Sequence, residues 1–159
     1  MLAIGCDHGG VNFKALLMTV LKQKNIPFKD FGCFSADAFD YPDVAQPLAE
    51  AVARGEYDKG ILICGTGIGM SIAANKVPGI RCAHCHDVFS ARATRKHNNA
   101  NIMSCGERVI GAGLFLEIVD VFLNTEFEGG RHQTRVDKIT DIEKKYAKPT
   151  EPPAKSRKK

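Results

Sequence analysis

The sequence predicts an α/β protein: a Rossmann-like three-layer sandwich in which helices cover both faces of a five-stranded parallel sheet and a further helix ends the chain. Three observations predict this class. Short apolar runs alternate with longer segments whose apolar residues recur at helical spacing. The run Gly60–Cys64 is apolar almost throughout, which is typical of a strand buried on both faces. Glycine and polar residues follow the apolar runs, at the carboxyl ends of the expected strands. Open parallel sheets bind their ligands at these ends.

The first half of the chain contains three expected strands and two expected helices. Apolar residues recur every three or four positions in both helical segments, and Pro47 makes the first turn of the second one less regular. In chain order we expect a strand at Leu2–Cys6, a helix at Val11–Lys24, a strand within Ile26–Gly32, a helix at Tyr41–Arg54 and a strand at Gly60–Cys64.

The second half continues the alternation and ends on two helices. Asp87 is a suitable N-cap for the second helix of this half, because its carboxylate can accept a hydrogen bond from an unpaired backbone N–H group. We expect a helix at Ile68–Val77, a strand at Gly79–His86, a helix at Val88–Lys96, a strand at Ile102–Cys105, a helix at Gly111–Leu123 and an amphipathic helix at Gln133–Tyr146.

Length and composition are those of one ordinary globular domain. The chain has 159 residues, of which 44% are hydrophobic and 25% charged. It has no run of 18 apolar residues, so we expect no membrane span. The segment Met1–Asp7 lacks the basic start and long apolar stretch of a signal peptide. We therefore expect a cytoplasmic protein whose six cysteines are reduced thiols.

Charge is distributed unevenly along the chain. Residues 144–159 contain seven lysines and arginines and one glutamate, so this segment carries +6 and the rest of the chain −2. Three prolines also lie there, which indicates a basic disordered tail at 148–159 after a domain at 1–147. A domain with net negative charge is a poor surface for tracking phosphates, so we expect no nucleic-acid partner.

The most informative segment joins the third expected strand to the next helix. It reads Cys64-Gly-Thr-Gly-Ile-Gly-Met70, and its glycines allow backbone N–H groups to approach an anion closely. The segment fails the dinucleotide fingerprint because residue 70 is not glycine, and it lacks the Gly-Lys-Ser/Thr ending of a phosphate loop. A tight strand-to-helix turn would also explain it. Cys64 is then either a buried apolar residue or a thiol whose thiolate the loop stabilises.

Two further clusters have structural and functional interpretations. Arg131 and Arg135 are spaced i, i+4, so on a helix they form either a solvated face or a phosphate clamp. Two cysteines and two histidines crowd into Cys82–His86, which could suggest a metal site. Alternate residues of a strand point to opposite faces, and structural zinc takes its ligands from two separated pairs, so we expect no metal there.

Several motifs together resemble ribose-5-phosphate isomerase type B, a family in the superfamily that includes galactose-6-phosphate isomerase subunits. The resemblance covers roughly residues 2–146. It is carried by Cys64-Gly-Thr-Gly-Ile-Gly-Met-Ser-Ile-Ala-Ala-Asn-Lys76, Pro78-Gly-Ile-Arg81, Cys85-His86-Asp87, His97-Asn98-Asn99-Ala-Asn101, Gly5-Cys-Asp7-His8, Asp40-Tyr41-Pro42-Asp43 and Gly106-Glu-Arg108.

The resemblance implies interconversion of ribose 5-phosphate and ribulose 5-phosphate through a cis-enediolate, without metal or cofactor. It implies that Cys64 is the base, since Met70 stands where some family members carry a glutamate. It implies that His97 opens the sugar ring and that Thr66 bonds the thiolate or a substrate oxygen, although an ordinary turn threonine is an equal alternative. The backbone amides that would hold the enediolate belong to Gly65, Gly67, Ile68, Gly69 and Met70.

The remaining implied site residues bind the sugar and its phosphate. Asp7, His8, Tyr41 and Asn98 match sugar contacts, with a capping aspartate or a turn histidine as the structural alternative. Arg108, Arg131 and Arg135 match the phosphate clamp. The family site lies between two subunits, so the resemblance implies a homodimer, possibly a tetramer, in which His97, Asn98 and Arg108 face the Cys64 loop of the partner.

Two other functions remain open on the sequence. One is the same chemistry on a six-carbon substrate, allose or galactose 6-phosphate. Galactose-specific subunits divide their catalytic residues between unlike chains, whereas Cys64, Thr66 and His97 occur together here. The other is a non-catalytic sugar-phosphate-binding module, which would need the arginines but neither Cys64 nor His97.

Overall fold

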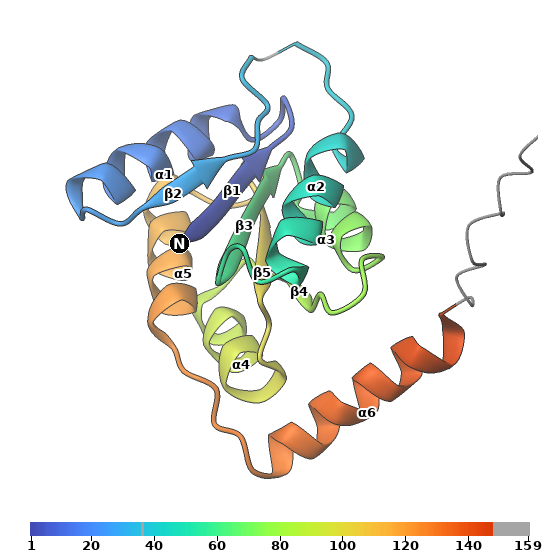
Figure 1. Ribbon diagram of the computed structural model, residues 1–159. Helices are drawn as coiled ribbons and strands as arrows, with labels where there is room; N and C mark the ends of the chain where they lie inside the picture. The colour runs from blue at the N-terminus through green and yellow to red at the C-terminus, as the bar shows by residue number, and fades with distance from the viewer. Residues whose placement is uncertain (36, 148–159) are drawn as a thin grey trace, which may run out of the picture.

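The sheet has the predicted five parallel strands. The computed structural model describes residues 1–35 and 37–147, and the expected tail at 148–159 lies outside them. The strand order is β2-β1-β3-β5-β4, and every pairing is parallel (Figure 1). The strands are β1 (Leu2–Cys6), β2 (Phe28–Asp30), β3 (Lys59–Cys64), β4 (Cys82–His84) and β5 (Ile102–Gly106).

The described residues form six helices beside the sheet, and five of them cover its faces. They are α1 (Val11–Gln23), α2 (Pro42–Ala53), α3 (Ile68–Ala74), α4 (Val88–Asn98), α5 (Ala112–Asn124) and α6 (Arg131–Tyr146). Residues of α1, α4 and α5 share one buried cluster with β1, β3 and β5, while α2 and α3 pack into a second cluster. The three-layer sandwich is therefore confirmed.

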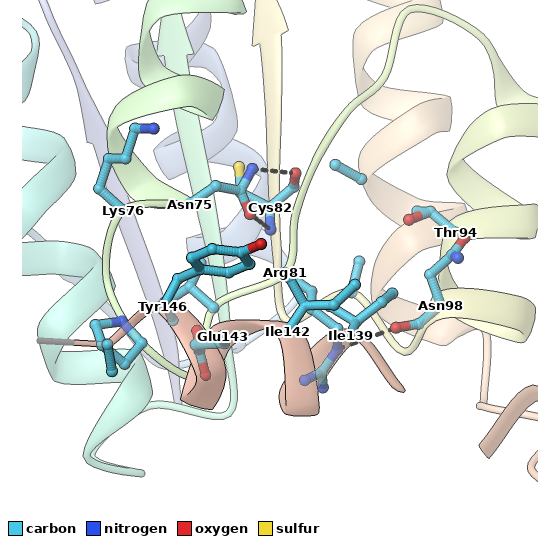
Figure 2. Close-up of a pocket in the computed structure, with 15 residues that line it drawn as sticks. Asn75, Lys76, Arg81, Cys82, Thr94, Asn98, Ile139, Ile142, Glu143 and Tyr146 are labelled. Carbon is cyan, nitrogen blue, oxygen red and sulfur yellow. Dashed lines mark hydrogen bonds between the residues drawn. The ribbon is translucent and has the colours of Figure 1, made fainter. Parts of the chain in front are cut away.

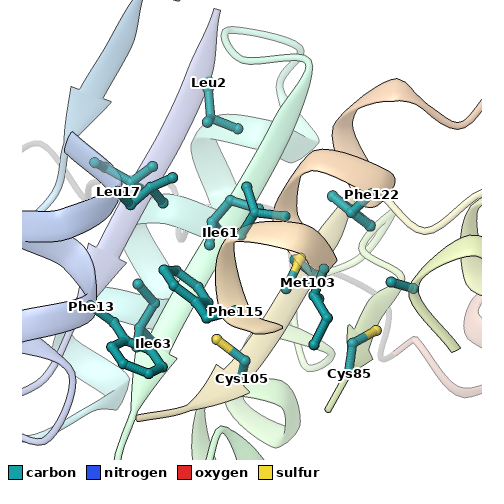
Figure 3. Packing of buried hydrophobic residues seen from close by; sticks show 14 of the residues in the cluster. Leu2, Phe13, Leu17, Ile61, Ile63, Cys85, Met103, Cys105, Phe115 and Phe122 are labelled. Atoms are coloured by element: carbon teal, nitrogen blue, oxygen red, sulfur yellow. The ribbon is translucent and has the colours of Figure 1, made fainter. Parts of the chain in front are cut away.

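The larger cluster is centred on an aromatic pair. Phe13 of α1 stacks on Phe115 of α5 with ring centroids 4.6 Å apart, and both rings lie over the sheet beside Ile63 (Figure 3). Phe115 and Ile63 are fully buried. These contacts hold α1 and α5 together on one face of the sheet.

Helix boundaries differ from the predicted ones where a side chain or a glycine ends the helix. Helix α3 stops at Ala74, because the Asn75 side chain turns back to bond both the N–H and the carbonyl of Cys82 at the start of β4. Helix α6 begins two residues earlier than expected, immediately after Gly129 and Gly130, which both have positive φ. As predicted, Asp87 caps α4, accepting a hydrogen bond from Ser90 N–H at 2.7 Å.

Helix α6 does not cover the sheet. It extends from the lower end of the molecule and packs mainly against α4, through buried His132 and Val136 (Figure 1). Its second half leaves Ile139, Ile142 and Tyr146 exposed by 45%, 59% and 74%. Within the described ranges no helix has the length and apolarity needed to cross a membrane.

Candidate active site

The loops that follow β1, β3 and β5 meet at the carboxyl edge of the sheet. They approach so closely that a Cβ on Gly9 would lie 2.8 Å from the backbone nitrogen of Gly65. A Cβ on Gly106 would lie 2.6 Å from the carbonyl carbon of Thr66. The chain reverses its direction across the sheet between β1 and β3, which is where an open parallel sheet opens its ligand crevice.

Cys64 ends β3 at the centre of this edge. Its side chain is buried, with 5% of the residue exposed. Its Sγ accepts a hydrogen bond from the Gly67 N–H at 2.9 Å. Gly67 adopts φ +80°, a left-handed conformation that glycine takes without steric cost, and this turn directs its N–H back at the sulfur. This backbone N–H donor fixes the position of the sulfur at the end of β3.

Four of the other five cysteines are held as thiols by burial. All six are free and buried. Burial raises the pKa of Cys6 to about 11 and the pKa values of Cys82 and Cys85 to about 12 each. Burial raises the pKa of Cys105 further still. These four residues are thiols at neutral pH and serve as small apolar side chains of the core.

The side chains of the loop divide between solvent and core. Ile68 is exposed, whereas Met70 is fully buried in the α2–α3 cluster and can offer a ligand only its backbone. The Thr66 hydroxyl accepts a hydrogen bond from Ile68 N–H at 3.3 Å. This contact makes Thr66 part of the local turn, and its O–H can still donate to the thiolate or to a substrate oxygen, so the expected role of Thr66 stays a prediction.

Three of the expected sugar contacts gather around the same loop. The ring of Tyr41 lies over Gly69, where a Cβ would come within 2.9 Å of its Cζ. Asp7 is buried and its carboxylate accepts the Gly9 N–H at 2.7 Å, so it also shapes the β1–α1 turn. His8 is exposed and bonds through Nδ1 to the backbone of Phe39. These residues and Cys64 form what we call the loop half of the site.

Arg108 also belongs to the loop half, so the expectation that it faces the Cys64 loop of the partner subunit was wrong. Its Cδ and Nε lie 3.3 Å from the position of a Cβ on Gly65 of the same chain. Arg108 follows β5 directly, and its N–H donates to the Gly65 carbonyl at 3.1 Å. This short connection holds Arg108 on the Cys64 loop of its own chain, so it is not positioned to approach the partner's loop.

The other expected residues lie at the opposite end of the molecule. His97 and Asn98 end α4, and the carbonyl of Asn98 accepts a hydrogen bond from Arg81, which precedes β4. Arg131 and Arg135 lie exposed in the first turns of α6. Figure 1 shows the end of α4 and the start of α6 together, below the amino ends of the strands. We call these residues the helix half of the site.

Two residues of the helix half were missed by the sequence analysis. The His132 ring stacks on the His97 ring, with centroids 4.4 Å apart and planes at 13°. A Glu128 oxygen lies 4.0 Å from Nε2 of His97 and 3.6 Å from Nε2 of His132. The available signal was the position of His132 between the two clamp arginines.

His97, Glu128 and His132 also have the side chains of a metal site. Their ligand atoms lie within 4.8 Å of one another. A metal bonds in the plane of an imidazole ring, and the planes of these two stacked rings, inclined by only 13°, meet too far from the rings for one ion to bond both. The Glu128 carboxylate also already has a cationic partner, because Lys96 Nζ lies 3.0 Å from it. The residues present do not fit a metal ion in this arrangement.

Fold and loops define an α/β protein with a buried thiol on an amide-rich glycine turn at the carboxyl edge of the sheet. The chain belongs to the ribose/galactose isomerase family, whose sequence profile matches residues 2–139. Ribose-5-phosphate isomerase B of Escherichia coli is 47% identical over 144 residues, which cover 91% of this chain and 97% of that protein. D-erythrulose-4-phosphate isomerase of Pectobacterium atrosepticum is 46% identical over 139 residues, covering 87% and 91%.

Solved structures agree in fold. The structure of Clostridium thermocellum ribose-5-phosphate isomerase B superimposes with a TM-score of 0.90 at 55% identity, covering 92% of this chain and 99% of that one. The predicted family resemblance and fold class are thus confirmed.

Proposed function

We propose that the chain interconverts D-ribose 5-phosphate and D-ribulose 5-phosphate by enediolate chemistry, with Cys64 as the base. The observation that carries this proposal is the Sγ of Cys64 held on the glycine turn by the Gly67 N–H, in a chain whose relatives include ribose-5-phosphate isomerases B. A binding module would not need a thiol presented in this way.

The proton transfer uses one base and a set of backbone donors. The Cys64 thiolate takes the proton from C2 of the open-chain aldose, and the electrons of that bond form the enediolate. The O2 hydroxyl proton passes to O1 across the cis-enediolate, and the thiol returns its proton to C1, which gives the ketose. Backbone N–H groups of Gly65, Gly67, Ile68, Gly69 and Met70 are the candidates to stabilise the enediolate oxygens, each worth about 3 kcal/mol on the usual scale of oxyanion donors.

The separation of the two halves supports a homodimer with shared sites. His97 cannot serve the Cys64 of its own chain from the opposite end of the sheet. Because a two-fold dimer makes every contact twice, it can bring each loop half to the helix half of the partner. Ring opening would then use His97 of one subunit, and proton transfer would use Cys64 of the other.

The face of α6 that looks toward the body offers a surface for this second copy. A groove of about 800 Å³ separates α6 from the body and is lined in part by Arg81, Asn98, Ile139, Ile142, Glu143 and Tyr146 (Figure 2). On α3, next to the Cys64 loop, Ile68 and Ile72 are also exposed. Exposed apolar residues therefore lie next to both halves of the site, and a dimer that joins the two halves would bury them.

The clamp arginines can be tested separately from the chemistry. Replacing Arg135 by alanine removes a charged, planar partner for the phosphate, and we expect KM for ribose 5-phosphate to rise about tenfold or more while kcat falls less. Steady-state kinetics measure both constants. Lys138→Ala removes a positive charge three residues further along α6 and serves as the control. An unchanged KM in Arg135→Ala would remove this residue from the clamp.

The proposed function itself is tested by turnover of the purified chain in the presence of a chelator. We expect ribulose 5-phosphate to form from ribose 5-phosphate at an unchanged rate after metal removal. A preference for erythrose 4-phosphate, allose 6-phosphate or galactose 6-phosphate would keep the chemistry and change the substrate. Tight binding of these compounds without turnover would contradict the isomerase and favour a binding module.

We also propose that the enzyme acts in the cytoplasm. Its six free, buried cysteines fit a compartment that keeps thiols reduced.

A further inference from the structure

The backbone that carries His97 is fixed by buried arginine contacts. Arg95 is buried, and its guanidinium donates to the carbonyls of Thr125 and Ala100 and to the Asn99 side chain. Arg81 also donates to the carbonyls of Asn98 and Asn99. Asn99 ends α4 in a left-handed conformation with φ 47°. Since the end of α4 is held so firmly, the orientation of His97 depends on what its own ring touches.

His132 supplies a flat, buried face for that ring. It is 5% exposed, and its Nδ1 has no hydrogen-bond partner among the described residues. The pKa of His132 is lowered by burial first, and then by the positive charges of His97, Arg131 and Arg135, against the opposite effect of Glu128. His132 is therefore a neutral ring at neutral pH. A neutral imidazole can stack on either protonation state of His97, whereas a second imidazolium would repel the charged one.

Glu128 supplies a fixed negative charge beside the pair. Its backbone N–H donates to the Lys96 carbonyl at 3.1 Å, and its carboxylate accepts from Lys96 Nζ at 3.0 Å. The hydrogen bond from Lys96 lowers the pKa of Glu128, so this carboxylate remains ionised. It lies 4.0 Å from Nε2 of His97, close enough to stabilise an imidazolium by charge.

We propose that Glu128 and His132 are positioning residues for His97: the stacked ring sets its orientation, and the carboxylate stabilises its protonated form. The inference rests on the proposed function. In ring opening the C1–O4 bond breaks, the ring oxygen gains a proton and the anomeric hydroxyl loses one. An imidazole that alternates between its two forms can carry both protons, and its charged form appears once in each cycle.

Two substrates separate this role from a general loss of activity. Ribose 5-phosphate is mostly a furanose and must be opened. Ribulose 5-phosphate stays open, because the phosphate occupies the oxygen that would close its ring. Deuterium incorporation from solvent at C1 of ribulose 5-phosphate therefore reports enediolate formation without ring opening. Turnover of ribose 5-phosphate reports both steps.

The variants are Glu128→Gln, His132→Ala and His132→Phe, with Glu126→Gln as the matched control two residues from Glu128. We expect Glu128→Gln and His132→Ala to lower ribose 5-phosphate turnover about tenfold, a part of the 10²–10⁴ that general acid–base catalysis provides. Deuterium exchange should stay within about twofold of wild type. His132→Phe keeps a flat stacking ring and should restore most of the turnover, while Glu126→Gln should change neither rate.

Three outcomes overturn the positioning role. One is unchanged turnover in Glu128→Gln and His132→Ala. Another is an equal loss of turnover and exchange, which would indicate damage to the phosphate clamp. The third is a His132→Phe variant as impaired as His132→Ala. Absence of both reactions in the unmodified protein would instead overturn the proposed function.

Discussion

A Cys64→Ala variant is expected to keep its fold and lose about a thousandfold or more in turnover of ribose 5-phosphate. The expected size follows from the 10²–10⁴ that a positioned acid or base contributes. In the proposed reaction the Cys64 thiolate takes the proton from the sugar, and Sγ is held at the end of β3 by the Gly67 N–H. Alanine leaves the turn in place and removes only the sulfur. Steady-state kinetics and a urea unfolding curve measure the two properties.

Cys85→Ala is the control for this variant. Cys85 is also buried, and burial raises its pKa to about 12, so it holds no thiolate at neutral pH. Its loss should cost stability and leave turnover within about twofold of wild type, because it packs in the core and not on the glycine loop. A Cys64→Ala protein that keeps substantial turnover would assign the base to another residue.

Gly67→Ala is expected to have the second-largest effect, about a hundredfold or more on turnover, the usual cost of losing an oxyanion donor. A Cβ at this position would lie 2.6 Å from the carbonyl carbon of Cys105 and 2.8 Å from Cε1 of His84. The loop must therefore move, and the Gly67 N–H leaves Cys64. Kinetics and urea unfolding measure the variant.

Gly79→Ala is the control that separates the effect of the Cβ clash in Gly67→Ala from the effect of backbone strain. Gly79 has φ +82°, close to the +80° of Gly67, but a Cβ there would meet no atom within 4 Å. Both substitutions carry the left-handed penalty of about 1–2 kcal/mol. Gly67→Ala should lose about 2 kcal/mol more, from overpacking against β5. Equal stabilities, with turnover intact in both variants, would show that the turn can accept a side chain.

The fold was predictable because its pattern is repeated along the chain. Buried strands such as β3 are apolar almost throughout, and the covering helices show helical spacing, so the order of elements and the sheet type followed directly. The predictions were wrong at the ends of helices and strands. Strand β4 begins at Cys82 instead of Gly79, where the Asn75 side chain binds the Cys82 backbone, and it ends at His84, two residues before the predicted end.

The site was predictable in part. Local sequence placed Cys64 on a glycine turn, because the strand, turn and helix are continuous in the chain. Arg108 and the pairing of His97 with His132 depend on how β5 and α6 pack in space, which no spacing in the sequence records. The family pattern named Arg108 as a ligand, but only the structure shows that it lies on the loop of its own chain.

The most direct test of the shared active site is complementation between two inactive chains. Cys64→Ala keeps His97, and His97→Asn keeps Cys64, so a dimer containing one of each has one site with both residues intact. Coexpression of differently tagged chains, followed by two affinity steps, isolates this mixed dimer. We predict that it recovers about half of wild-type turnover while each variant alone stays inactive. A mixed dimer as inactive as its parents would contradict a site that joins Cys64 of one subunit to His97 of the other.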